Sequence, residues 1–185
     1  MVDSIQIISD RLILRPIRLD DSDLIFKYRS DSITNKYQSW IPKTAIDVQN
    51  FIKTKVSSEI DIPDTWFGLA IIKKENGELI GDVGIHFLKT DKYQAEIGCT
   101  INKNFHRMGY ASEALKKTIN YLFNKLNKRR IIASIDPRNV KSIEMIERLG
   151  FRKEAHFRES IFFNNEWVDD LVYAILKDEW NKKNN

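Results

Sequence analysis

The sequence predicts one α+β domain spanning residues 1–185, with a mostly antiparallel mixed sheet flanked by helices. Residues 95–101 alternate between apolar side chains and polar or small ones, which is typical of a strand with two different faces. From Ala111 onward, apolar residues recur at helical spacing and predict a helix with one apolar face. Asn76-Gly77 lies between two apolar runs, which is the strongest short signal for a β-hairpin. A chain of this length can bury one sizeable core.

In the first third of the chain the sequence predicts one strand and two helices. Residues 11–15 favour a strand that Pro16 ends. An acidic cluster at residues 20–23 is typical of a helix start, where carboxylates complement the helix dipole. A second helix is expected to begin near Thr44, after an aromatic loop at residues 37–42. The apolar faces expected for these helices are Leu24, Ile25 and Tyr28 in the first, and Val48, Phe51, Ile52 and Val56 in the second.

The rest of the chain is expected to mix strands with helices. A short helix at residues 140–149 should end before Gly150, because glycine is the usual residue just past a helix C-terminus. The last two strands are expected to form a closing pair around Asn164-Asn165. The predicted strands of this part are residues 66–73, 79–88, 95–101, 130–135, 151–163 and 167–176.

Gly109-Tyr110-Ala111 lies between the strand at residues 95–101 and the helix that follows it. A turn with so little side-chain bulk lets the N–H groups at the helix start approach a ligand closely. Those unpaired donors and the helix dipole favour an anion, most naturally a phosphate, and His106 and Arg107 can add positive charge beside it. The alternative is an ordinary strand–helix turn. A nucleotide P-loop and a dinucleotide fingerprint do not fit, because Gly-Lys-Ser/Thr and the three-glycine spacing are missing.

Three segments together resemble the GNAT N-acetyltransferase superfamily. Residues 95–98 followed by residues 106–114 resemble its acetyl-CoA loop, with His106 where Gln or Arg is usual and Arg107 where this branch often has Gly. The segment from Asp136-Pro137-Arg138-Asn139 to Leu149-Gly150-Phe151 resembles the superfamily's next segment. Residues 10–16 resemble the branch that contains the RimJ/RimL ribosomal-protein alanine acetyltransferases. In this order the matches span nearly the whole chain.

The resemblance implies both a fold and a cosubstrate. In the GNAT fold the central strands splay apart, and coenzyme A inserts its pantetheine arm into the gap. The implied activity is direct transfer of an acetyl group from acetyl-CoA to a primary amine, without a metal. The residues implied to bind the coenzyme are Cys99, Thr100, Ile101, His106, Arg107, Met108, Gly109, Tyr110, Ala111, Ser112, Asn139 and Ser142.

Acetyl transfer from a thioester to an amine requires that the amine lose a proton and that the departing thiolate regain one. The resemblance implies Ser142 as the proton donor. The alternative is a simple first-turn serine in a helix that Asn139 caps. Glu96 is the candidate base, acting through water, although a strand carboxylate on a polar face is more often merely solvated. His86 is a second candidate for the base and a candidate for contact with the acceptor.

The acceptor site is expected to be aromatic. Tyr37, Trp40 and Trp167 are the candidates, with the first two in the loop that covers the acceptor in this family; the alternative is that they are core residues. A protein or peptide N-terminal α-amine is the favoured acceptor, because its reference pKa of about 7.7–8.0 lies well below the value of about 10.4 for a lysine-type amine. The alternatives are a polyamine or small-molecule amine, or a noncatalytic module that keeps the fold and binds coenzyme A as a sensor.

Composition bounds the remaining functions. With 42% hydrophobic and 30% charged residues, no apolar run long enough to span a membrane and no secretory signal, the chain is expected in the cytoplasm. The single Cys99 cannot form an internal disulfide and is expected to be a small apolar strand residue. Three His and one Cys supply no metal-ligand spacing. The net charge of +4 lies in short basic clusters without aromatic interleaving, so nucleic acid is not expected as a partner. The oligomeric state is left open, with a homodimer as one candidate.

Overall fold

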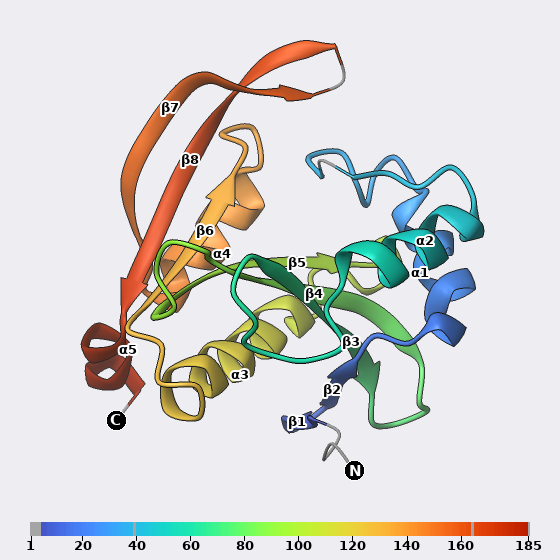
Figure 1. Ribbon diagram of the computed structural model, residues 1–185, viewed down its shortest axis with the longest axis horizontal. Coiled ribbons are helices and arrows are strands. Elements are labelled where there is room, and N and C mark those ends of the chain that lie inside the picture. The colour runs from blue at the N-terminus through green and yellow to red at the C-terminus, as the bar shows by residue number, and fades with distance from the viewer. Residues whose placement is uncertain (1–4, 39, 164, 185) are drawn as a thin grey trace.

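The computed structural model describes residues 5–38, 40–163 and 165–184. Within them, the chain forms one eight-stranded sheet, five α-helices and two short 3-10 helices, which confirms the α+β class (Figure 1). The strands are β1 Ile7–Ile8, β2 Leu12–Pro16, β3 Thr65–Lys73, β4 Leu79–Phe87, β5 Gln94–Ile101, β6 Arg130–Ile135, β7 Arg152–Phe163 and β8 Glu166–Leu176. The helices are η1 Leu19–Asp21, α1 Ser22–Arg29, α2 Ala45–Lys55, η2 Lys103–Phe105, α3 Tyr110–Asn124, α4 Val140–Leu149 and α5 Lys177–Asn184.

The sheet is antiparallel except at one junction, between β5 and β6. Its strand order is β1-β2-β3-β4-β5-β6-β8-β7. β4 and β5 pair along nearly their whole length, whereas β5 and β6 run parallel and pair only from Gln94–Glu96 to residues 130–132. Beyond Glu96 the two strands diverge, so the other five residues of β5 have no strand partner on that side in the described part of the chain. The expected splay of the central strands is therefore confirmed.

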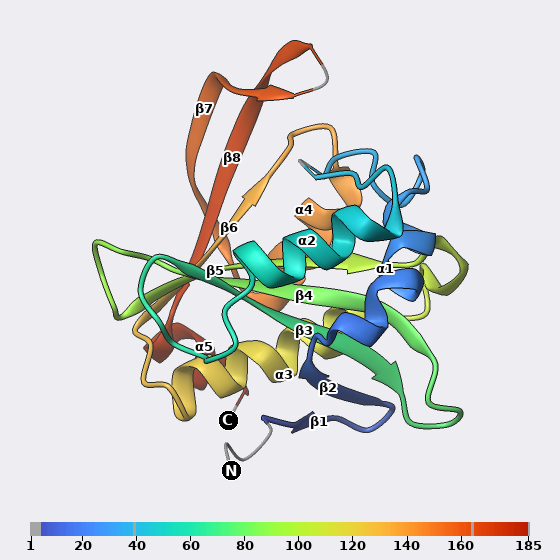
Figure 2. The same ribbon diagram turned by 45° about the vertical axis from the view of Figure 1, so that its right-hand side comes forward.

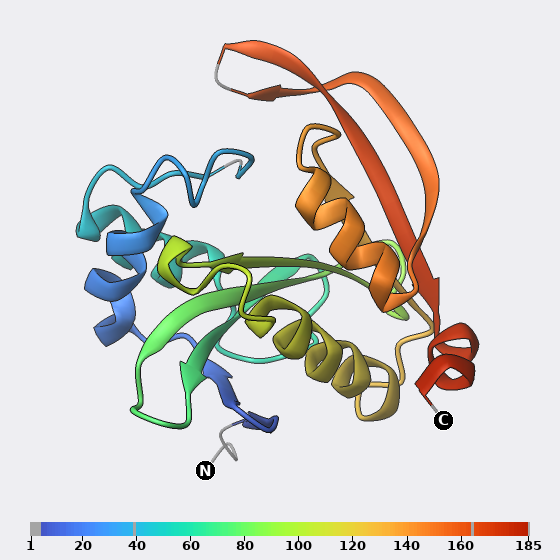
Figure 3. The same ribbon diagram turned by 180° about the vertical axis from the view of Figure 1, so that it is seen from behind.

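Helices cover both faces of the sheet, and each face has its own cluster of buried apolar side chains. α1 and α2 lie on one face, where Ile25, Tyr28 and Val48 pack together with Ala70 and Leu79 (Figure 2). α3 and α4 lie on the opposite face, where the larger core forms (Figure 3). The side chains that α3 buries are Ala114, Leu115, Thr118, Ile119, Leu122 and Phe123.

The β7–β8 hairpin rises away from the rest of the sheet towards the loop between α1 and α2 (Figures 1 and 2). Two register shifts interrupt its pairing, at residues 153–155 and 157–161. Such β-bulges bend a strand and increase its twist, which explains how the hairpin arches over the side of the sheet that carries α1 and α2. The predicted turn at Asn164-Asn165 falls in this hairpin, and Asn164 lies outside the described residues.

Most predicted elements are confirmed, and three differences have physical causes. Pro16 is the last residue of β2, so the strand ends at the proline but includes it; Pro16 pairs with Leu69 beyond the end of the two-residue strand β1, where the described residues offer no ladder partner on its other side. Leu24 is 50% exposed, because burial of Ile25 turns the neighbouring position to solvent. α5 was not predicted: its only buried side chain among the described residues is Trp180, so it lacks an apolar period.

The described residues contain no helix whose length and apolarity would allow it to cross a lipid bilayer.

Candidate active site

The turn before α3 leaves a helix N-terminus without a side-chain cap. Gly109 occupies the N-cap position with φ of +81°, in the left-handed region that favours glycine, and Arg107 also has a positive φ of 62°. Helical geometry leaves the N–H groups of Tyr110, Ala111 and Ser112 without intrahelical acceptors. In the described part of the chain no side chain caps this end. Backbone donors and the helix dipole together make it suited to an anion.

The side chains around this turn divide into those that shape it and those that face outward. The His106 ring is occupied within the turn, since its Nε2 lies 2.7 Å from the carbonyl oxygen of Ile101. Arg107 and Met108 are exposed. Thr100 and Ile101 are buried, so the backbone is the part of them that a ligand could reach. Contact of these residues with a coenzyme stays a prediction.

Cys99 lies on the same strand and is partly buried. Burial raises the pKa of its thiol well above the ordinary value, with Asp82 adding to the rise and Arg29 opposing it. A thiol of this kind stays protonated at neutral pH and is a poor nucleophile. The prediction of a small apolar strand residue therefore fits its surroundings.

On the other side of the gap that opens between β5 and β6 beyond Glu96, β6 leads to the N-terminus of α4. Asn139 caps this helix, with its side-chain oxygen accepting a hydrogen bond from the backbone N–H of Ser142 at 3.3 Å. The partly buried Ser142 hydroxyl has no hydrogen-bond partner among the described residues. Because β5 and β6 are parallel, their carboxyl ends lie at the same edge of the sheet, and crevices at such strand ends are common ligand sites. Gly109 thus caps α3 and Ser142 lies in the first turn of α4, and these two helices follow the two diverging strands.

A row of three side chains crosses the sheet on the face that α1 and α2 cover. The strand register pairs Trp66 with His86 and His86 with Glu96. The Trp66 and His86 rings stack with centroids 4.8 Å apart, and His86 Nδ1 lies 3.8 Å from Oε2 of Glu96. Burial raises the pKa of Glu96; His86 opposes this, and Asp170 adds to it. A carboxylate with a raised pKa is a stronger base, so the row is chemically suited to accept a proton from an amine.

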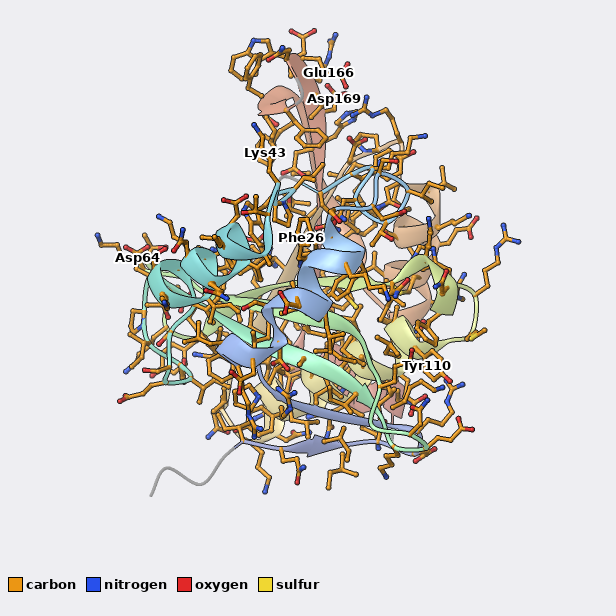
Figure 4. All side chains as sticks on the ribbon, turned by 90° about the vertical axis from the view of Figure 1, so that its right-hand side faces the viewer. Phe26, Lys43, Asp64, Tyr110, Glu166 and Asp169 are labelled. Atoms are coloured by element: carbon orange, nitrogen blue, oxygen red, sulfur yellow. The ribbon has the colours of Figure 1, made fainter. Side chains whose placement is uncertain are left out.

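The aromatic candidates for the acceptor site lie in different places. Trp40 stacks on Phe51 with ring centroids 4.2 Å apart and lines a groove of about 600 Å³, which Trp66 also lines. Tyr37 lines a second groove of about 460 Å³ with Arg138 and the hairpin residues Phe163 and Glu166. Figure 4 labels Lys43 in the first groove and Glu166 in the second, above it on the hairpin.

Trp167 belongs to neither of these grooves. It is 61% exposed on the β7–β8 hairpin and packs against Phe162 at 5.3 Å. The structure therefore does not place it beside Tyr37 or Trp40, and its predicted role in acceptor binding stays untested.

Three residues at this site were missed from the sequence as functional candidates: Trp66, Asp170 and Arg11. The pairing of Trp66 with His86 depends on a register shift between Ile71 and Ile72, which moves the register set at the Asn76-Gly77 turn by one residue, so this neighbour left no local signal. Asp170, which accepts a hydrogen bond from Ser134 at 2.6 Å, comes from a distant strand and left no local signal. Arg11 also acts at long range and contacts the turn before α3.

Among the described residues there is no cluster of three or more His, Cys, Asp or Glu that could hold a metal ion.

Known proteins are similar to this chain in sequence and in fold. A family model described as "Acetyltransferase (GNAT) domain" matches residues 11–152. The uncharacterized N-acetyltransferase YnaD of Bacillus subtilis is 34% identical over 179 residues, covering 95% of this chain and 99% of that protein. A crystal structure of a GNAT-family acetyltransferase from Bacillus anthracis has a TM-score of 0.83 and 30% identity, covering 94% of this chain and 99% of the other.

A third relative is similar over a shorter stretch. The ribosomal protein uS5 alanine N-acetyltransferase of Escherichia coli is 27% identical over 116 residues, which cover 62% of this chain and 59% of that protein. The family match spans the turn at Gly109, the start of α4 and the row of Trp66, His86 and Glu96. The chain belongs to the GNAT family and is an acetyltransferase.

Proposed function

We propose that this acetyltransferase moves the acetyl group of acetyl-CoA directly to a primary amine, and that the amine is the N-terminal α-amine of a protein or peptide. The observation that carries the proposal is the split between β5 and β6, with the open N-terminus of α3 on one side and, on the other, the Ser142 hydroxyl, which has no hydrogen-bond partner among the described residues. GNAT acetyltransferases use acetyl-CoA, which supplies an acetyl thioester.

The coenzyme site is proposed along the open edge of β5 and the start of α3. Backbone N–H groups at residues 109–112 would hold the pyrophosphate, because they lack intrahelical acceptors and lie at the positive end of the helix dipole. The unpaired edge of β5 beyond Glu96 offers peptide groups to the amides of the pantetheine arm. Gly98 has no side chain, and the space beside it is open, because a Cβ built on it would meet no atom within 4 Å.

The proton transfers are proposed to divide between two residues. The amine nitrogen attacks the thioester carbonyl, a C–N bond forms and the C–S bond breaks. Glu96 takes the proton that the amine loses, through a water molecule, and its raised pKa favours this role. Ser142 donates its hydroxyl proton to the departing sulfur and regains one from solvent. His86 lies between Trp66 and Glu96, where it stacks on the indole and faces the carboxylate, and it would keep the Glu96 side chain in place.

The acceptor is inferred from amine chemistry. At pH 7 about a tenth of an α-amine with a pKa near 8 is already unprotonated, whereas a lysine-type amine near 10.4 reaches the same fraction only if the site lowers its pKa by about 2.4 units, or roughly 3 kcal/mol. One carboxylate acting through water is a modest base and suits the first case. The partial similarity to the uS5 alanine N-acetyltransferase supports the same acceptor class.

An acceptor screen tests this assignment. The protein is incubated with acetyl-CoA and equal concentrations of a short peptide beginning with Ala or Ser, the same peptide with a blocked N-terminus but a free lysine, and spermidine. Mass spectrometry is expected to show acetylation of the free N-terminus fastest. A protein that acetylates spermidine readily and ignores N-terminal peptides would overturn the acceptor class, and release of no thiol with any amine would overturn the whole proposal.

A further inference from the structure

The guanidinium of Arg11, the residue just before β2, contacts the turn that precedes α3. The Nη1 of Arg11 donates to the carbonyl oxygen of Met108 at 3.0 Å, just before Gly109. Its Nε donates to Oε2 of Glu113 at 2.7 Å, and its Nη2 lies 2.6 Å from the same oxygen. The guanidinium carbon also lies 4.4 Å from the centroid of the Tyr110 ring. Arg11 therefore contacts residues on both sides of Gly109, although Arg11 and Glu113 are 102 positions apart in the sequence.

The Glu113 carboxylate is held by more than this ion pair. Its other oxygen, Oε1, accepts the backbone N–H of Arg11 at 2.8 Å and the hydroxyl of Ser9 at 2.7 Å. Burial raises the pKa of Glu113, but the Ser9 hydroxyl and the Arg11 donors lower it more, so the net shift is downward. Glu113 is therefore a fixed negative charge in the first turn of α3.

A fixed negative charge at this place has two opposite effects. It complements the helix dipole, which stabilises α3. It also lies in the same first turn as the N–H groups that would hold a pyrophosphate, and two negative charges near one another repel. The positive guanidinium of Arg11 cancels the charge of Glu113, while its bond to Met108 keeps the turn in position.

We propose that Arg11 is a positioning residue for coenzyme A, which holds the turn at Gly109 and neutralises Glu113 so that the start of α3 can accept a phosphate group. This inference rests on the proposed coenzyme site. It predicts a specific loss in affinity for the coenzyme, because the acceptor side of the sheet has no contact with Arg11 among the described residues.

A double-mutant cycle read by calorimetry with coenzyme A tests the inference. Arg11→Gln is expected to raise the Kd about tenfold, which corresponds to about 1.4 kcal/mol. Adding Glu113→Gln to Arg11→Gln is expected to recover most of the loss, because the uncompensated anion is then gone. In steady-state assays the single variant should raise the KM for acetyl-CoA and leave the KM for the acceptor and kcat within about twofold. Arg11→Lys, which keeps the charge but not the fork, should fall between native protein and Arg11→Gln.

Arg129→Gln is the matched control, because Arg129 is an exposed arginine paired with Asp91 at 2.7 Å beyond the other end of α3. It should not change the Kd. If Arg11→Gln binds coenzyme A as tightly as native protein, or if the double variant binds no more tightly than Arg11→Gln, the inference is wrong. If Arg11→Gln does not fold, the same comparison is made between Arg11→Lys and its combination with Glu113→Gln. Native protein that binds no coenzyme A would instead refute the proposed coenzyme site.

Discussion

The proposed coenzyme side and the proposed acceptor side of the site are built in different ways. On the coenzyme side, a short turn and the backbone of one helix present the donors, and this turn follows β5 and the 3-10 helix η2 directly in the chain. On the acceptor side, Trp40, Trp66 and Glu96 come from a loop, β3 and β5, and the hairpin of β7 and β8 adds a second groove. The first side depends on backbone geometry and the second on side chains that long-range pairing brings together.

This difference predicts how the two sides tolerate change. A site made of backbone N–H groups is disturbed mainly by added bulk or by altered conformation at the turn. A site made of side chains can change its substrate through single substitutions while the fold stays intact. Coenzyme affinity and acceptor choice should therefore respond to separate sets of variants, and the predictions below test that separation.

The largest expected effect is on the chemical step. Ser142→Ala is expected to lower kcat roughly a hundredfold, in line with the usual contribution of a general acid. The Kd for coenzyme A should change little, because Asn139 still caps α4 through the backbone N–H of residue 142. Steady-state kinetics with a saturating peptide acceptor measures the first quantity and calorimetry the second. An alanine variant with near-normal turnover would reduce Ser142 to a first-turn helix residue.

The next effect concerns coenzyme binding. Gly109→Val is expected to raise the Kd for coenzyme A well over tenfold, or more than about 1.4 kcal/mol, because a β-branched side chain disfavours the left-handed backbone and obstructs the N–H groups. Gly77→Val is the matched control. Gly77 also has a positive φ, of 71°, but lies in the β3–β4 turn with open space around it. The control should lose stability without losing affinity, and equal losses of affinity in both variants would contradict a backbone phosphate site.

The smallest of these effects depends on pH. With a peptide α-amine near pKa 8, Glu96→Gln is expected to lower kcat/KM about tenfold at pH 7 and hardly at all at pH 9, where solvent has already deprotonated most of the amine. A loss that is the same at both pH values would remove Glu96 from the proton transfer. The measurement is a pH profile of kcat/KM for the native and variant proteins.

Stability gives an independent check on Glu96. Because burial raises its pKa in the folded protein, the protonated form fits the fold better, and the stability that this provides is lost as pH rises through the folded pKa. Glu96→Gln should therefore raise the Tm at pH 7, and the gain should fade as the pH falls through that pKa. Thermal unfolding followed by circular dichroism tests the sign.

The sequence predicts the helix ends around the proposed site better than the neighbours of its side chains, for a physical reason. Gly109, Asn139 and Gly150 each mark a helix end through a local backbone requirement, and the structure places all three at helix caps. Trp66 reaches His86 through strand pairing, and Asp170 acts on Glu96 through a charge interaction across the sheet, neither of which a local pattern encodes. Arg11 lay inside a recognised segment, yet its contact with Glu113 became visible only in three dimensions.

The central claim is that coenzyme A lies along the open edge of β5 and at the start of α3, away from the aromatic groove beside α2. Titration of isotope-labelled protein with coenzyme A, followed by amide resonances in NMR spectra, tests it most directly. The largest shifts are expected at residues 97–101 and 109–112, with Trp40, Phe51 and the indole of Trp66 nearly unmoved. Shifts concentrated in that groove, with Gly98 and Gly109 unchanged, would contradict the account.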